Sequence, residues 1–129
     1  MSVWPLSTSE GQLVSVSIRV NADNLESLLE ALARVSFPIN PQIYHDAAVV
    51  YRYSDDREET QSATLVEFPA YASNLDEVRA ALSAYGFDPE CMLVVDMLEE
   101  IQSASHPEPA PPGAKYVSRY RLKHRAAVA

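Results

Sequence analysis

Two arginines and three acidic residues fall at matched places in the strand-like runs of this sequence. Paired strands would bring Arg19 near Asp96 and Glu67, and Arg52 near Glu67. Such a set could bind a polar ligand or transfer protons. It could equally form cross-strand ion pairs that set the register of a subunit interface. The candidate ligand-binding or interface residues are Arg19, Tyr44, Asp46, Arg52, Glu67 and Asp96.

His45 is a second candidate, because it falls among aliphatic residues on the apolar side of a strand-like run. With Tyr51 as a partner it could act as a general acid or base. The alternative is a core histidine whose nitrogens bond to a tyrosine hydroxyl or to the backbone. No metal-ligand spacing is present, so we expect no metal and no cofactor. Cys91, the single cysteine, is most simply a small buried residue.

A basic tail is the most distinctive local feature. Residues 115–129 hold five of the ten basic residues and none of the 18 acidic ones, so residues 1–114 carry about −13 and the tail about +5. Its alternating residues suit an added edge strand that docks on the chain itself or on a dimer mate. A free tail and nucleic-acid binding are the alternatives, and the acidic body disfavours the latter. The expected tail contacts are Arg119, Tyr120, Arg121 and Lys123.

Bulk composition is that of one globular domain. The chain has 129 residues, 47% of them hydrophobic, and a net charge of −8. Nothing resembles a signal peptide or a stretch of about 18 apolar residues, so we expect a cytoplasmic protein without membrane contact. We expect a folded domain over 1–102 with its core at 13–101, a proline-rich linker over 103–114, and the tail over 115–129.

An internal repeat organises the chain. Residues Ala22–Asp46 align without gaps with Ala72–Asp96, and the strand-like runs before the two copies keep the same offset. Alternating apolar residues predict strands over 13–20, 42–53, 60–71 and 92–98. Stripes at helical spacing predict a helix at the start of each copy, with Leu32 and Leu82 in the core. The predicted order is therefore βαββαβ.

This order with its twofold repeat resembles the ferredoxin-like architecture of ACT-like regulatory domains and of dimeric α/β proteins. The resemblance implies an α+β two-layer sandwich with an antiparallel sheet in the order 4-1-3-2, both helices on one face, and a C-terminal extension that could add a strand. It covers about Leu13 to Ile101.

The repeat also assigns the two faces of the sheet. In each strand, the more apolar set of alternate residues is expected to face the helices. These sets are Val14/Val16/Ile18, Ile43/His45/Ala47, Val66/Phe68 and Leu93/Val95/Met97. The open face would then be half apolar and half charged. An apolar patch of that size indicates a partner, and we expect a second subunit to cover it in a C2 homodimer. That open face would carry Ser15, Ser17, Arg19, Tyr44, Asp46, Val50, Arg52, Leu65, Glu67, Val94, Asp96 and Leu98.

Three functions are compatible with these features. The first is a non-enzymatic, homodimeric ligand-binding or regulatory module of the ACT-like kind, with a small polar ligand. The second is a small cofactor-free enzyme of the dimeric α/β-barrel type that uses His45 and a tyrosine. The third is a protein-interaction or assembly module that uses the basic tail.

Overall fold

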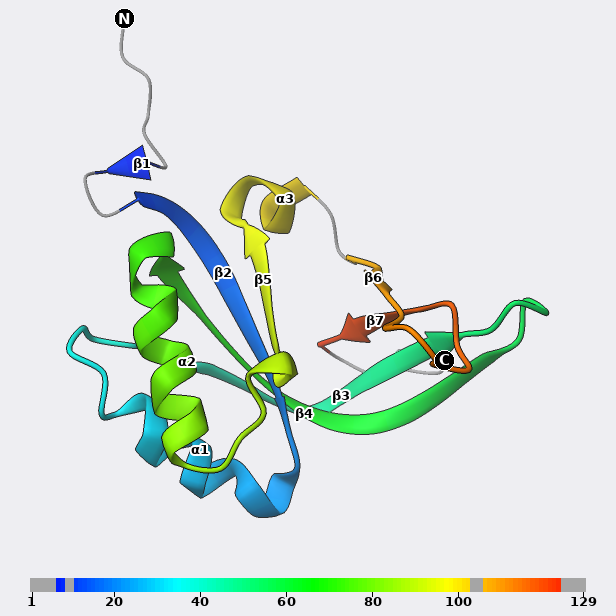
Figure 1. The fold of residues 1–129 in the computed structure, drawn as a ribbon, viewed down its shortest axis with the longest axis horizontal. Helices are drawn as coiled ribbons and strands as arrows, with labels where there is room; N and C mark the ends of the chain where they lie inside the picture. The colour runs from blue at the N-terminus through cyan, green and yellow to red at the C-terminus, as the bar shows by residue number, and fades with distance from the viewer. Residues whose placement is uncertain (1–6, 9–10, 103–105, 124–129) are drawn as a thin grey trace, which may run out of the picture.

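The computed structural model describes residues 7–8, 11–102 and 106–123, and these form one curled antiparallel sheet with the helices at 25–32 and 75–84 on one face (Figure 1). The strands are β1 Ser7–Thr8, β2 Gly11–Val20, β3 Gln42–Arg52, β4 Glu58–Tyr71, β5 Met92–Asp96, β6 Glu108–Pro109 and β7 Ser118–Leu122. The α-helices are α1 Leu25–Leu32, α2 Leu75–Ala84 and α3 Met97–Gln102, and the 3-10 turns are η1 Ala22–Asn24, η2 Ala72–Asn74 and η3 Pro89–Cys91.

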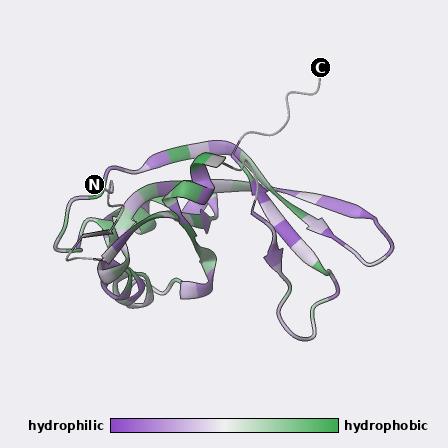
Figure 2. Ribbon diagram, turned by 90° about the horizontal axis from the view of Figure 1, so that it is seen from above, coloured by the Kyte–Doolittle hydropathy of each residue, from purple (hydrophilic) through white to green (hydrophobic). Residues whose placement is uncertain are grey.

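The two-layer ferredoxin-like sandwich expected from the sequence is wrong. Apart from the short β1, the strands run in the order β5-β2-β4-β3-β7-β6, which is a six-stranded curled half-barrel. The hairpin of β3 and β4, with 11 and 14 residues, is too long for the helices to cover. Its outer part bends away from them (Figure 2). There β3 pairs with β7, which in turn pairs with β6.

Strand β2 lies beside β4, as the repeat predicts, in a continuous antiparallel ladder from Leu13↔Tyr71 to Val20↔Thr64. The two repeat copies also start their helices identically, since η1 and α1 recur as η2 and α2 fifty residues later. Gly86 follows α2 with a φ of +83°, a left-handed conformation that favours glycine at a helix end.

The hydrophobic core lies between the helices and one face of the sheet. Val16, Ile18 and Phe68 on the strands meet Leu28 on α1 and Leu82 on α2, and all five are buried. The alternation of β2 and β4 therefore predicts the helix side of these two strands correctly. Burial of these side chains is the main force that holds the helices to the sheet.

A β-bulge in β3 changes the face that its later residues occupy. Tyr44 pairs with Leu65 and Ala47 with Ala63, so His45 and Asp46 together oppose one residue of β4. An extra residue shifts the alternation by one. The expected helix-side position is therefore wrong for His45, which is exposed in the bulge, and for Ala47, which faces away from the helices. Ile43 precedes the bulge and pairs with Val66 on the helix side, but it is 36% exposed.

The bulge also changes which residues of β3 lie on the open face. The sequence places Val50 and Arg52 there, whereas the register gives that face to Val49 and Tyr51. Arg52 pairs with Glu58 at 3.4 Å and does not reach Glu67.

In β5, too, the side chains lie on the faces opposite to those expected. Leu93 pairs with Ser17 and Val95 with Ser15, so both lie on the face away from the helices, while Val94 packs against the core. The chain turns into α3 at Met97, so Met97 and Leu98 do not continue the strand. The register with β2 decides this phase, and it differs from the phase that alignment with the bulged β3 suggests.

The sheet face opposite the helices is the inside of the curl. Three ladder spacings of about 4.8 Å separate β2 and β7 in a flat sheet, or roughly 14 Å. Nevertheless Arg121 on β7 bonds directly to Ser17 on β2 at 2.8 Å. The sheet must therefore curl until side chains of β7 reach β2 across its inner face. Side chains of the tail thus occupy the face that we expected a second subunit to cover.

Candidate functional site

The tail brings three basic side chains into the curl. Strand β7 pairs with the outer part of β3, from Ala48↔Leu122 to Arg52↔Ser118. Docking on the body of the same chain, one of the three outcomes considered for the tail, is thus confirmed for residues 118–122, and His124 and the rest of 124–129 lie outside the described residues. Alternate residues of a strand share a face, so Arg119, Arg121 and Lys123 point the same way.

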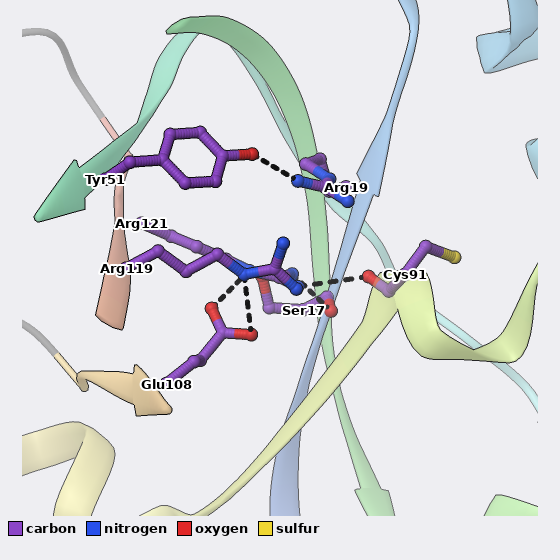
Figure 3. A network of polar contacts seen from close by, with 7 residues as sticks. All are labelled: Ser17, Arg19, Tyr51, Cys91, Glu108, Arg119 and Arg121. Atoms are coloured by element: carbon purple, nitrogen blue, oxygen red, sulfur yellow. Dashed lines mark hydrogen bonds and ion pairs between the residues drawn. The ribbon is translucent and has the colours of Figure 1, made fainter. Parts of the chain in front are cut away.

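Arg121 is the centre of this arrangement (Figure 3). Its Nη1 donates to the main-chain oxygen of Ser17 at 2.8 Å and to Ser17 Oγ at 3.1 Å, and its Nη2 donates to the carbonyl of Cys91 at 3.2 Å. Its Nε donates to Glu108 at 3.1 Å. The side chain is only 5% exposed. Burial lowers the pKa of Arg121 below its ordinary value, and the negative charge of Glu108 opposes that shift.

Glu108 joins the tail to the segment before it. One carboxylate oxygen accepts from Arg121 and the other lies 3.6 Å from Nε of Arg119. Glu108 belongs to β6, which pairs with β7 through Glu108↔Arg119 and Pro109↔Ser118. The proline-rich stretch expected to be a linker therefore contributes one strand and one buried acid to the site.

Lys123 forms a second polar cluster deeper along the inner face. Its Nζ lies 2.7 Å from Glu100 and 3.1 Å from Glu67, and Glu100 also contacts His106 Nε2 at 3.1 Å. Its ammonium group lies 5.7 Å from the centre of the Tyr44 ring. The cavity beside this cluster measures about 20 Å³, which is room for one water. One ammonium group bonds to carboxylates from β4 and α3, so the cluster ties the tail to both elements.

A larger hollow opens between the two edges of the curled sheet, and we call it the seam cleft. Asp88 and residues 90–93 of η3 and β5 form one wall, and residues 108–111 of β6 and its following turn form the other. Arg19, Tyr116 and Arg119 complete the lining. Its volume is about 780 Å³. This is within the range of small-molecule sites, which is about 300 to 1,000 Å³.

Arg19 stands out among the charges of the seam cleft. Its Nη1 donates to the hydroxyl of Tyr51 at 3.0 Å, and its side chain is half-buried. Within the part of the chain that the structure describes, no carboxylate lies within ion-pair distance of Arg19. By contrast, Arg119 and Arg121 share Glu108. Glu108 thus faces two guanidinium groups, and the guanidinium of Arg19 lies near them without a carboxylate of its own in the described residues (Figure 3).

Cys91 lines the same cleft and is half-buried. Burial raises the pKa of its thiol above the ordinary value of 9.0, although the positive charges of Arg121 and Arg19 oppose the shift. The thiol is therefore protonated at neutral pH and is a weak nucleophile.

The structure separates most of the residues that the sequence grouped. Arg19 and Glu67 lie on the inner face, but Arg19 bonds to Tyr51 and Glu67 pairs with Lys123. Asp96 accepts a bond from Gln12 Nε2, and Asp46 and His45 are exposed at the bulge. His45 therefore does not sit in a core pocket beside Tyr51, because the bulge displaces it.

Two acids of the site carried no signal in the sequence. Glu108 lies in a stretch with the composition of a linker, and Glu100 lies just after the last strand predicted from the sequence. The alternation of Arg119, Arg121 and Lys123 was the available sign that three cations share one face. Only the pairing of the strands in the structure reveals which acidic residues face these three cations.

Two absences among the described residues bear on the class of site. No group of three histidine, cysteine or acidic side chains lies close enough together there to hold a metal ion. No helix there has both the length and the apolar character that a membrane crossing requires.

Comparison with protein-family models, with curated proteins and with solved structures finds no match to this chain.

Proposed function

We propose that this protein binds a small anionic molecule in the seam cleft, through the guanidinium groups of Arg19 and Arg119. One observation carries the proposal: Arg19 is half-buried at the cleft and has a tyrosine hydroxyl, but no carboxylate, as its partner in the described residues. A buried charge without a counter-ion is costly, so it favours binding of an anion. A guanidinium can hold a carboxylate or phosphate through two parallel bonds.

The walls of the cleft suggest the rest of the ligand. Met92, Leu93 and Pro109 offer apolar surface, and Tyr116 offers an aromatic ring next to Arg119. Asp88 and Glu90 stand at the exposed rim, where they would repel a highly charged anion. A ligand with one anionic group and an apolar body fits this distribution of charge.

The same residues favour binding over catalysis. The thiol of Cys91 is protonated, and no histidine in the described residues lines the cleft to act as its base. His45 and Tyr51, the pair considered for proton transfer, are separated because Tyr51 points inward to Arg19 and His45 is exposed. The cleft therefore offers fixed positive charge and shape without a nucleophile and base in contact.

The test is calorimetric titration of the full chain with inorganic phosphate, citrate and benzoate as probes. We expect at least one of them to bind, and Arg19→Gln to weaken it by roughly tenfold to a hundredfold, as loss of a hydrogen bond to a charged group does. Arg79→Gln is the matched control, because Arg79 is an exposed arginine on α2 paired with Asp76. Absence of binding by all three probes, or equal affinity in Arg19→Gln, would refute the proposal.

The homodimer expected from the sequence is retained as a second proposal, on a different surface. The tail occupies the inner face, whereas Leu98 and Ile101 on α3 are 55% and 73% exposed and lie one helical turn apart. Two neighbouring exposed aliphatic residues support an association surface there. Analytical ultracentrifugation of the wild type and of Ile101→Glu tests this second proposal by their oligomeric state. A wild type that is monomeric at all concentrations would refute it.

A further inference from the structure

The seam cleft lies between two strand edges that are unpaired in the described residues. Strand β5 pairs only with β2, and β6 pairs only with β7, so each presents one free edge at the end of the curled sheet. Residues from both strands line the cleft, and β5 lies on the side of β2 that faces β6 and β7 in Figure 1. The cleft is thus the open seam of a half-barrel.

The two edges differ in what they can bind. Alternate residues of β5 direct their N–H and C=O groups away from β2, and these groups can pair with an added strand. On β6, Pro109 has no N–H to donate, and prolines also stand at positions 107 and 111. Proline on an edge blocks strand addition. A segment that entered the seam would therefore pair with β5.

The position of Arg19 selects the direction of such a segment. Ile18 pairs with Met92, so Arg19 is level with the residue just before β5 begins. A strand added antiparallel to β5 ends its chain at that level, and a parallel strand begins there. Arg19 would meet a carboxyl terminus in the first case and an amino terminus in the second. A guanidinium repels an ammonium group, so the antiparallel arrangement is favoured.

Building on the anion site proposed above, we propose that the seam cleft binds the carboxyl-terminal end of an extended peptide, with its backbone paired to β5 and its terminal carboxylate held by Arg19. The last residues of the peptide lie along Met92 and Leu93, because the N–H of Cys91 already donates to Asp88 and its carbonyl already accepts from Arg121. Alternate side chains of the peptide face inward, where Leu93 and Tyr116 favour apolar groups. Main-chain bonds supply affinity in this mode of recognition, and the carboxylate supplies the selection for a chain end.

The test uses a randomised pool of five-residue peptides with free carboxyl termini and the same pool with amidated termini. The full-length protein is immobilised, and mass spectrometry measures the peptides that it retains. The peptide that is retained most is then titrated by fluorescence anisotropy in four forms. Two have a free or an amidated carboxyl terminus, and two have a free terminus and an N-methyl group at one of two successive backbone nitrogens. Each form is measured against the wild type, Arg19→Gln and the control Arg79→Gln.

We expect the acid to bind at least tenfold more tightly than the amide, and Arg19→Gln to abolish that ratio without lowering the melting temperature. N-methylation should weaken binding at one of the two amides only, because alternate N–H groups face β5. Equal retention of the acid and amide pools, or equal effects of the two N-methyl groups, overturns the peptide inference. If phosphate or citrate still binds through Arg19, the anion site survives that result; if nothing binds, both proposals fail.

Discussion

The guanidinium of Arg121 lies 2.8 Å from the main-chain oxygen of Ser17, and 104 residues separate the two in the chain. This bond joins the last described strand to the first long one, across the inside of the curl. The same side chain also bonds to Glu108 and to the carbonyl of Cys91. One arginine therefore fastens the tail, β6 and the start of β5 to β2, and it holds together the walls of the seam cleft.

Arg121→Met should lower the free energy of unfolding by about 3 kcal/mol, because it removes the bonds to Ser17 and Cys91 and leaves Glu108 with only Arg119 at 3.6 Å. Urea denaturation measures the loss. Arg57→Met at the exposed hairpin tip is the control, with an expected change below about 0.5 kcal/mol. The double variant Arg121→Met with Glu108→Leu should regain part of the stability, since it removes both charges. A single variant as stable as the wild type would mean that the tail is not fastened through Arg121.

Lys123 should make stability depend on pH in the alkaline range. Burial disfavours its charge, but hydrogen bonds to Glu100 and Glu67 outweigh burial and raise its pKa above the ordinary 10.5. A raised pKa gives stability that is complete below the unfolded value of 10.5 and is lost as pH rises through the folded value. The wild type should therefore lose its advantage over Lys123→Met above about pH 10.5. Melting curves of both proteins from pH 8 to 12 test this; parallel curves throughout that range would contradict it.

Cys91 should react slowly with thiol reagents at pH 8, because burial raises its pKa above 9.0 and leaves little thiolate. The reaction rate should keep rising above pH 9, where the thiolate of a free cysteine is already more than half formed. Alkylation rates from pH 7 to 11, with glutathione as the reference thiol, measure the difference. A rate that levels off below pH 9 would show that the pKa of the thiol is set by the arginines rather than by burial.

Leu32→Ala and Leu82→Ala should each cost roughly 2–5 kcal/mol, as truncation of a buried leucine does. Leu82 is fully buried and Leu32 is 4% exposed, and both occupy the same place in the two repeat copies. Thermal or urea unfolding measures the cost. Val117→Ala, at a position 55% exposed, serves as the control and should change stability by less than about 0.5 kcal/mol. A cost below that level at either leucine would remove it from the core.

Local patterns were sufficient for much of the fold. The alternation of Val14, Val16 and Ile18 predicted a buried strand face, and the spacing of Leu32 and Leu82 predicted the helices that cover it. The ladder between β2 and β4 followed from the repeat. These features depend on neighbours within a few residues, or on a symmetry that is visible in the chain itself.

The candidate site depended on features that no local pattern contains. Arg19 was identified from the sequence as a ligand candidate, but its expected acidic partners, Asp96 and Glu67, bond elsewhere. Glu108 sits in a proline-rich stretch whose composition indicates a linker. Its carboxylate matters because β7 brings Arg121 to it, and that placement is a property of the curled sheet.

By itself, then, the sequence determined the strands and helices of the repeated part, the core residues of β2 and β4, and the presence of a tail with three cations on one face. Only the tertiary structure decided the curl, the phase of β3 and β5, and the residues that meet the tail. The physical reason is that one extra residue in a strand reverses every following side chain, and a few degrees of bend per strand add up to a contact between distant strands. Both effects arise from how strands pair across the sheet, so the order of residues along one strand cannot reveal them.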